Sequence, residues 1–389
     1  MKRNASLLVL TLFALTLLGT NAFAQAVGVF AGGLKAPVRI ILTPGGNLLV
    51  AESGTGHMDG RISIIDKSGS RRTLVDGLPS AINLSGGEPA PSGPAALVLR
   101  GRTLYVVIGS GDATLPGPAP GSEIPNPQPT STLFSSVLAL RFPASVDISG
   151  GDFAFTASNY ANLAGGGKLK TSNSSGERLV ADVLVNFRDF ADEPRPDLPN
   201  NVRASNPFGA DIRGNALYVA DASENLVYRV DLDTGDSEVL ARFGPKPNPL
   251  PFGPPVMEAV PNNVRVFGKQ LLVPFLMGFP FAQGSAEIRK VNLANDSQAT
   301  FIGGLTSAID VLPVTGAQGQ DQFYTLEFST DMLANAPGRL QFFSSPGATP
   351  TVVAAGIPTP ISLARDQQTN AIYISSIFTG NIFKVQGVQ

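Results

Sequence analysis

Three carboxylates occupy the same place in a recurring pattern of short apolar strands. They are Glu52 in LLVAE, Asp221 in LYVAD and Glu327 in FYTLE. Equivalent positions of a repeat fold lie at similar radius and height, so the three side chains are expected near one mouth of a central channel. Hard cations such as Ca²⁺ and Mg²⁺ accept oxygen ligands of this kind, and Asn206 and Asn263 can add neutral ones.

The alternative for each carboxylate is a local role in its own loop. Asp221 would then accept hydrogen bonds from the amides of Ser223 to Asn225, as in an Asx-type turn. The same carboxylates are also the candidates for acid–base catalysis, but sequence spacing does not supply the separation between them. Both interpretations stay open at this point.

Missing residue types limit the chemistry further. The chain has no cysteine, which excludes disulfides, thiolate nucleophiles and cysteine-ligated metals. His57 is the only histidine, so any Ser-His-Asp triad would need it, and no G-x-S-x-G segment is present. A net charge of −2 over 389 residues gives no basic footprint for nucleic acid.

The carboxylates belong to a unit of apolar strands that recurs six times along the chain. The first unit contains LLVAE (48–52) and RISIID (61–66), and the last contains IYISS (372–376) and NIFKV (381–385). Further apolar strands precede and follow such pairs. Four antiparallel strands per unit predict an all-β fold, a six-bladed β-propeller with four-stranded blades. A β-sandwich or a β-helix does not account for this four-strand period.

The two ends of the repeat region are expected to complete one blade. The last unit stops after NIFKVQ without a fourth strand, and AVGVFAGGL (26–34) has the pattern of the missing strand. We therefore expect the N-terminal strand to pair with the last blade and close the ring, which would cover an open sheet edge.

The segment before this strand predicts export. Lys2 and Arg3 precede an apolar run, and Ala22-Phe23-Ala24 fits the small-x-small cleavage rule. Residues 1–24 are therefore predicted to be a secretory signal peptide, and residues 25–389 a single propeller domain without a membrane span. The expected location is the periplasm or the extracellular space.

Two insertions interrupt the regular period. Residues 111–132 are rich in Pro and Gly and lie between the middle strands of the second blade. Residues 142–206 are predicted to carry the outer strand of that blade as ERLVADVLVNF (177–187), followed by an acidic, proline-rich loop. Loops of this kind lie on a propeller face, where binding sites are commonly found.

Phe279 and Phe281 lie in a predicted loop between two strands, within LMGFPFAQGSAEIRKVNL (276–293). They alternate with Pro280, so both rings can point to one side. One interpretation is an aromatic wall at the channel mouth for a planar apolar ligand. The other is that the two rings fill a gap between blades and make the loop rigid.

Several segments, in order along the chain, resemble the ScyD/ScyE family of exported β-propellers, relatives of NHL-type and strictosidine-synthase-like propellers. The segments are PGGNLLVAESGTG (44–56), SNPFGADI (205–212), LYVADASENLVYRVD (217–231), GFPFAQGSAEIRKV (278–291) and IYISSIFTGNIFKV (372–385). The resemblance implies a propeller, export and a link to synthesis of scytonemin, a pigment with indolic and phenolic units. It implies no catalytic residues. Val38-Arg39 and NVR (263–265) depart from the family pattern.

Three functions follow as hypotheses. The first is binding of a small molecule, for which an aromatic compound is one option, at the channel mouth in support of an extracytoplasmic biosynthetic step. The second is a metal-assisted hydrolase of the lactonase or strictosidine-synthase-like kind, with Ca²⁺ or Mg²⁺ on the three carboxylates. The third is a scaffold for a protein partner. The ligand-binding candidates are Glu52, Asn206, Asp221, Asn225, Asn263, Phe279, Phe281 and Glu327.

Overall fold

The computed structural model describes residues 27–85, 88–193, 198 and 200–387, and the predicted signal peptide lies outside them. Strands dominate these residues, and their one helix is the short α1 (Ala157–Ala164). Within the same ranges, no helix combines the length and the apolar character that crossing a membrane requires. The described chain is therefore all-β in class.

Six of the sheets share one plan, in which strands that follow one another in the chain are antiparallel neighbours. The first strands are β2 (Pro37–Leu42), β8 (Pro94–Arg100), β18 (Pro207–Arg213), β24 (Arg265–Phe267), β28 (Ala308–Thr315) and β32 (Pro360–Arg365). The second strands are β3 (Leu48–Glu52), β9 (Thr103–Ile108), β19 (Ala216–Asp221), β25 (Gln270–Pro274), β29 (Asp321–Glu327) and β33 (Ala371–Ser376).

The remaining two strands of each sheet follow in the same order. The third strands are β4 (Gly60–Ile65), β12 (Ser136–Arg141), β20 (Leu226–Asp231), β26 (Ala286–Asn292), β30 (Gly338–Phe343) and β34 (Asn381–Gln386). The fourth strands are β5 (Arg71–Leu78), β15 (Arg178–Asn186), β21 (Ser237–Arg242), β27 (Gln298–Leu305), β31 (Thr351–Ile357) and, in the last sheet, β1 (Gly28–Ala31).

The last sheet thus takes its fourth strand from the other end of the chain. β1 is antiparallel to β34, with Gly28 opposite Lys384 and Val29 opposite Phe383. The sequence predicted this strand pairing from the missing fourth strand of the last unit. It covers the edge of β34 that would otherwise expose unpaired backbone groups.

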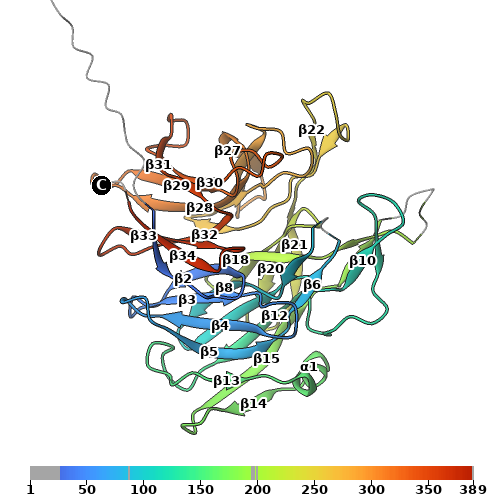
Figure 1. The fold of residues 1–389 in the computed structure, drawn as a ribbon, viewed down its shortest axis with the longest axis vertical. Coiled ribbons are helices and arrows are strands. Elements are labelled where there is room, and N and C mark those ends of the chain that lie inside the picture. The colour runs from blue at the N-terminus through green and yellow to red at the C-terminus, as the bar shows by residue number, and fades with distance from the viewer. Residues whose placement is uncertain (1–26, 86–87, 194–197, 199, 388–389) are drawn as a thin grey trace, which may run out of the picture.

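First strands of successive sheets contact one another. β2 contacts β8 and β32, β18 contacts β8 and β24, and β28 contacts β24 and β32. In Figure 1, β32 to β34 lie between β2–β5 and β28–β31. Four-stranded antiparallel sheets in this succession are an arrangement of the propeller type.

Apolar side chains fill the spaces between neighbouring sheets. Every residue of β3 and β19 is buried, whereas β5 has exposed residues at its start and near its end. This difference is expected when the middle strands are covered on both faces. Between two sheets, the Phe187 and Tyr228 rings stack with their centroids 4.5 Å apart.

The insertions were expected to be loops on a propeller face apart from the strand at 177–187, but they carry most of the remaining strands and the helix. The segment 177–187 forms β15, which pairs with β12 as an outer strand. A separate sheet joins the two insertions and contains β10 (Thr114–Pro116), β11 (Glu123–Pro125), β17 (Val202–Ala204) and β16 (Phe190–Asp192). The edge additions and short hairpins are β13 (Phe153–Ala154), β14 (Leu169–Ser172), β6 (Ala81–Asn83) with β7 (Ala90–Ser92), and β22 (Lys246–Pro247) with β23 (Val256–Met257).

The sheets define two faces. We call the end at which the first strands begin the start face, and the end at which they finish the end face. Because neighbouring strands are antiparallel, second strands finish at the start face and third strands begin there. The β6–β7 and β22–β23 hairpins and the sheet of β10, β11, β16 and β17 all belong to loops of the start face.

Candidate functional site

The three predicted carboxylates lie at the start face, each at the end of a second strand and each fully buried. In every case the side chain accepts a hydrogen bond from a backbone amide just before the first strand of its own sheet. These amides are Lys35 N for Glu52 (2.6 Å), Asn206 N for Asp221 (3.0 Å) and Thr306 N for Glu327 (2.6 Å). The carboxylate at this shared position of the repeat therefore fixes the segment that leads into the first strand of its sheet.

Arginines on the neighbouring strand neutralise two of the three. Arg61 lies opposite Glu52 in the ladder, with Nε and Nη2 donating to its carboxylate at 3.0 and 2.5 Å. Arg339 lies opposite Glu327 and donates its Nε to that carboxylate. Across the described ranges, no group of three His, Asp or Glu residues has the spacing to hold a metal ion. The structure does not bring the three carboxylates together.

Asp221 has the local role in its own loop that was the alternative to metal binding. Its carboxylate accepts from Ser205 Oγ at 2.6 Å and from the amides of Ser223 and Glu224 at 3.2 and 2.9 Å. Burial raises the pKa of Asp221 to about 6, and the hydrogen bonds from Ser205, Glu224 and Asn206 only partly offset this effect. The group thus forms an Asx-type turn at the end of β19.

Asn263 belongs to a buried polar network among the first strands. Its Nδ2 donates to Asp310 Oδ1 at 2.5 Å, and its Oδ1 accepts from Arg39. Arg265 donates Nε and Nη2 to Asp310 at 3.0 and 2.7 Å, and Arg39 Nη1 lies 3.3 Å from the same carboxylate. We call Arg39, Asn263, Arg265 and Asp310 the axial network, because β2, β28, β24 and the two residues before β24 supply it where the first strands meet.

Charge pairing governs the protonation of this network. Burial by itself would raise the pKa of Asp310, but Arg265 and then Arg39 outweigh it and lower that pKa. For Arg39, burial lowers the pKa to about 10 against the opposing effect of Asp310. Arg39 Nε is buried without a hydrogen-bond partner in the part of the chain that the structure describes. Asp310 is shared by two arginines, and both ends of the Asn263 amide are bonded within the network, so Asn263 is not free to bind a ligand.

Asn225 also has a structural role. Its Nδ2 donates to Glu258 Oε2 at 2.5 Å, and its Oδ1 accepts from the amide of Val260 at 2.7 Å. Its φ of 54° lies in the left-handed region that Asn tolerates better than most residues. Asn225 therefore ties the loop after β19 to the segment that precedes β24.

Phe279 and Phe281 lie in the loop between β25 and β26, as the sequence predicted. Their rings meet edge to face with centroids 6.0 Å apart, and Phe252 lies 6.4 Å from Phe279 on the loop between β22 and β23. The Phe279 side chain is 48% exposed. The Gly278 amide donates a hydrogen bond to the Glu258 carbonyl oxygen at 2.8 Å, which ties this loop to the segment before β24. The three rings form a small aromatic cluster on the start face.

Asn206, in contrast, lines a cavity. The cavity has a volume of about 230 Å³ and lies at the start face. Asn206 Oδ1 accepts from the amide of Ser110 at 3.3 Å, while its Nδ2 has no hydrogen-bond partner within the described residues. The lining side chains that the site depends on come from three of the six sheets and from the β6–β7 hairpin; they are Val38, Glu88, Ser92, Asn206, Phe208 and Ile377. Phe279 and Phe281 do not line this cavity.

Three charged residues of the axial network were not predicted from the sequence to belong to a site: Arg39, Arg265 and Asp310. A signal was present, because each charge interrupts an otherwise apolar first strand: VRIIL (38–42), NVRVF (263–267) and the β28 segment. Two of these segments are also where the chain departs from the family that it resembles. Ser92 and Phe208 of the cavity carry no comparable signal, since serine and phenylalanine are common residues at the ends of strands.

Comparison with known proteins informs on the fold. No protein-family model and no curated protein matches the sequence. A protein from Bacteroides thetaiotaomicron with a provisional phosphatase name aligns with a TM-score of 0.50 and 11% identity, over 92% of this chain and 72% of its own. A streptogramin B lyase aligns with a TM-score of 0.44 and 13% identity, over 93% of this chain and 97% of its own. A chain of a nidogen/laminin complex aligns with a TM-score of 0.41 and 11% identity, over 87% of this chain and 93% of its own. At identities this low, a likeness to a solved structure bears on the fold alone and not on function.

Proposed function

We propose that the chain is a six-bladed propeller, closed by the pairing of β1 with β34, that binds a small molecule in the start-face cavity. The observation that carries this proposal is the cavity of about 230 Å³ beside Asn206, whose Nδ2 has no partner within the described residues. Such a volume lies below the range typical of drug-sized ligands, so a small metabolite is the expected class of ligand.

The lining decides what such a ligand would look like. Val38, Phe208 and Ile377 offer apolar surface, while Asn206 Nδ2 can donate a hydrogen bond. A planar apolar body with one acceptor group, such as a phenol, satisfies both sides of the cavity. This chemistry agrees with the indolic and phenolic units that the ScyD/ScyE resemblance implies. The proposal therefore includes export through residues 1–24 and assistance to an extracytoplasmic biosynthetic step of the scytonemin type.

The carboxylates do not favour a metal-assisted hydrolase. Glu52 and Glu327 are each neutralised by an arginine of the same sheet, and Asp221 is occupied by amide and hydroxyl donors. Binding a cation there would require breaking these interactions. We therefore propose ligand binding without a Ca²⁺ or Mg²⁺ cofactor.

Titration with p-cresol and with toluene, followed by ligand-observed NMR, tests the site. We expect p-cresol to bind more tightly than toluene, because only the phenol can accept from Asn206. Asn206→Asp keeps an acceptor for the Ser110 amide but removes the donor, and it should weaken p-cresol binding about tenfold. Phe279→Ala is the matched control on the same face and should leave binding unchanged.

The opposite pattern would place the ligand elsewhere. If Phe279→Ala abolished p-cresol binding and Asn206→Asp did not, the aromatic cluster of Phe252, Phe279 and Phe281 would be the site. If neither p-cresol nor toluene bound at millimolar concentrations, the proposed ligand class would be wrong.

A further inference from the structure

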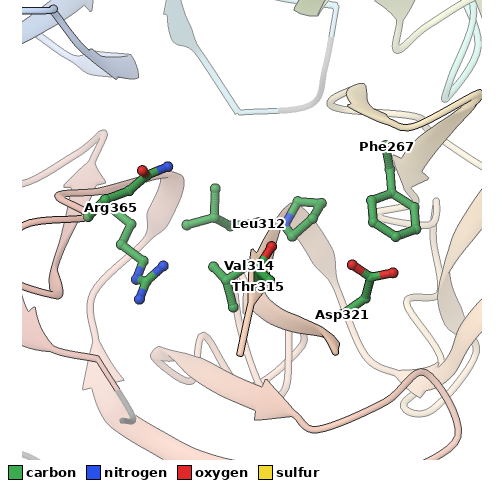
Figure 2. A pocket seen from close by; sticks show the side chains of 8 residues that line it. Phe267, Leu312, Val314, Thr315, Asp321 and Arg365 are labelled. Atoms are coloured by element: carbon green, nitrogen blue, oxygen red, sulfur yellow. The ribbon is translucent and has the colours of Figure 1, made fainter. Parts of the chain in front are cut away.

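A second cavity lies at the opposite end of the first strands, on the end face. It has a volume of about 460 Å³ and is lined by residues at or near the ends of β24, β28 and β32 and by Asp321 at the start of β29 (Figure 2). An adjoining cavity of about 480 Å³ shares Val314, Thr315 and Arg365 with it. Both volumes fall in the range of small-molecule sites. The axial network lies between this end face and the start-face cavity. Its Arg265 precedes Phe267 by two residues in β24, and its Asp310 precedes Leu312 by two residues in β28.

Arg365 supplies a charge that is oriented but not neutralised. Its Nε donates to Asn370 Oδ1 at 2.7 Å, which fixes the plane of the guanidinium group. In the described part of the chain, neither Nη atom has a hydrogen-bond partner and no carboxylate forms an ion pair with it. A planar guanidinium with free Nη donors is suited to a carboxylate, which it can bind through two parallel hydrogen bonds.

The wall beside Arg365 is apolar. Leu312 and Val314 are half-buried, so part of each side chain faces the cavity. Phe267 is held by the rings of Phe323 and Phe301, whose centroids lie 5.5 and 6.1 Å from its own, and it also lines the cavity. Burial of an apolar body against these three side chains would add to the affinity for the charged group.

Asp321 lies at the other end of the cavity. Figure 2 shows Leu312, Val314 and Thr315 between Arg365 on one side and Phe267 with Asp321 on the other. A ligand with a carboxylate on Arg365 and an apolar body along the wall would thus point its far end toward Asp321. A second carboxylate at that end would be repelled.

We propose that this end-face cavity is a binding site for a monocarboxylate with an aryl or short alkyl body. Arg365 holds the carboxylate, Phe267, Leu312 and Val314 hold the apolar body, and Asp321 selects against dicarboxylates. This site is separate from the start-face cavity, and it does not depend on the function proposed there.

Isothermal titration of the full chain with phenylacetate and with phenylacetamide tests the charge requirement. We expect phenylacetate to bind and the neutral amide to bind about tenfold or more weakly. Arg365→Gln should weaken phenylacetate binding by about tenfold to a hundredfold, because it removes the charge-assisted pair. Arg213→Gln is the matched control, since Arg213 ends the first strand β18 in the same way but does not line this cavity.

Selectivity tests the role of Asp321. Benzene-1,4-diacetate should bind the unmodified chain more weakly than phenylacetate. Asp321→Asn should reduce the ratio of the two dissociation constants several-fold. Melting curves show whether each variant is folded. Should Arg365→Gln not fold, the comparison of acid with amide on the unmodified chain still decides. Equal binding of acid and amide, undiminished binding by folded Arg365→Gln, or no binding of phenylacetate at millimolar concentration would each overturn the proposal.

Discussion

At the scale of single residues, the buried acids of this protein work mainly as loop anchors. Glu52, Asp221 and Glu327 each accept an amide from the segment entering their own sheet. A buried carboxylate without such donors would be costly to ionise, and a neighbouring arginine or several amides reduce that cost. Asp221 is the one of the three that has no arginine opposite it in the ladder, where Leu226 lies instead.

Asp221 should therefore give the protein a distinctive pH dependence. Its pKa is raised by burial from 3.8 to about 6, so between these values the folded state keeps a proton that the unfolded state releases. The free energy of unfolding should fall as pH rises through this window, by about 2 to 3 kcal/mol for such a shift. Asp221→Asn removes this dependence, and urea unfolding at several pH values measures the difference.

Exposed Glu238→Gln serves as the control for that experiment, because its side chain is 68% exposed. We expect the advantage of the unmodified chain over Asp221→Asn to be larger at pH 4 than at pH 7. Parallel stability curves for the unmodified chain and Asp221→Asn would show that Asp221 does not titrate in this window.

At the scale of elements, β1 joins the two ends of the chain. Its Phe30 ring lies 4.9 Å from the Tyr373 ring, and Lys384 Nζ lies 5.5 Å from the Phe30 centroid. The strand therefore adds side-chain contacts to its backbone pairing with β34. Without β1, the third strand β34 would be the edge of its sheet and would expose unpaired backbone groups.

Phe30→Ala should weaken this connection. Loss of the aromatic contact and of part of the buried surface is expected to lower the free energy of unfolding by about 2 kcal/mol. Chemical denaturation measures the change, and size-exclusion chromatography shows whether an uncovered β34 edge causes association. Phe378→Ala is the control, since this ring is 61% exposed and makes no ring contact within the described ranges. Equal effects of the two substitutions would argue against a special role of β1.

At the scale of the whole molecule, the axial network connects sheets that are far apart in the chain. Arg39 and Asp310 are separated by 271 positions, yet they face each other where the first strands meet. Asp310 is shared by two arginines and also accepts the Leu363 amide at 2.8 Å. A single carboxylate thus links β2, β24, β28 and β32.

Asp310→Asn should destabilise the whole molecule. It removes the carboxylate that Arg39 and Arg265 share and leaves both buried charges without a directly bonded partner, at a cost of about 3 to 5 kcal/mol. Arg39→Met should cost less, because Asp310 keeps Arg265 as its partner. Urea unfolding of both variants tests this order. Glu238→Gln, which breaks the exposed pair with Arg229, should change stability by less than about 1 kcal/mol. An Asp310→Asn variant as stable as Arg39→Met would contradict the proposed sharing.

The strands were predictable because their signal is local. Runs such as LLVAE and SVLALR form β3 and β12 with the predicted bounds, since backbone pairing and apolar burial both favour them. The strand at 177–187 was likewise found within an insertion. The missing fourth strand of the last unit even identified β1 as the partner of β34.

By itself, the sequence determined an all-β chain of repeated four-strand units and the residue types that chemistry could use. Only the tertiary structure decided which of them meet. Equivalence along a repeat suggested that three acids converge, but each turned toward an amide or arginine of its own sheet because a buried charge takes the nearest donor. Arg39, Arg265 and Asp310 meet across long separations, and the cavities of Asn206 and Arg365 arise where several sheets end. Contacts of that kind depend on how sheets pack, which no short stretch of sequence specifies.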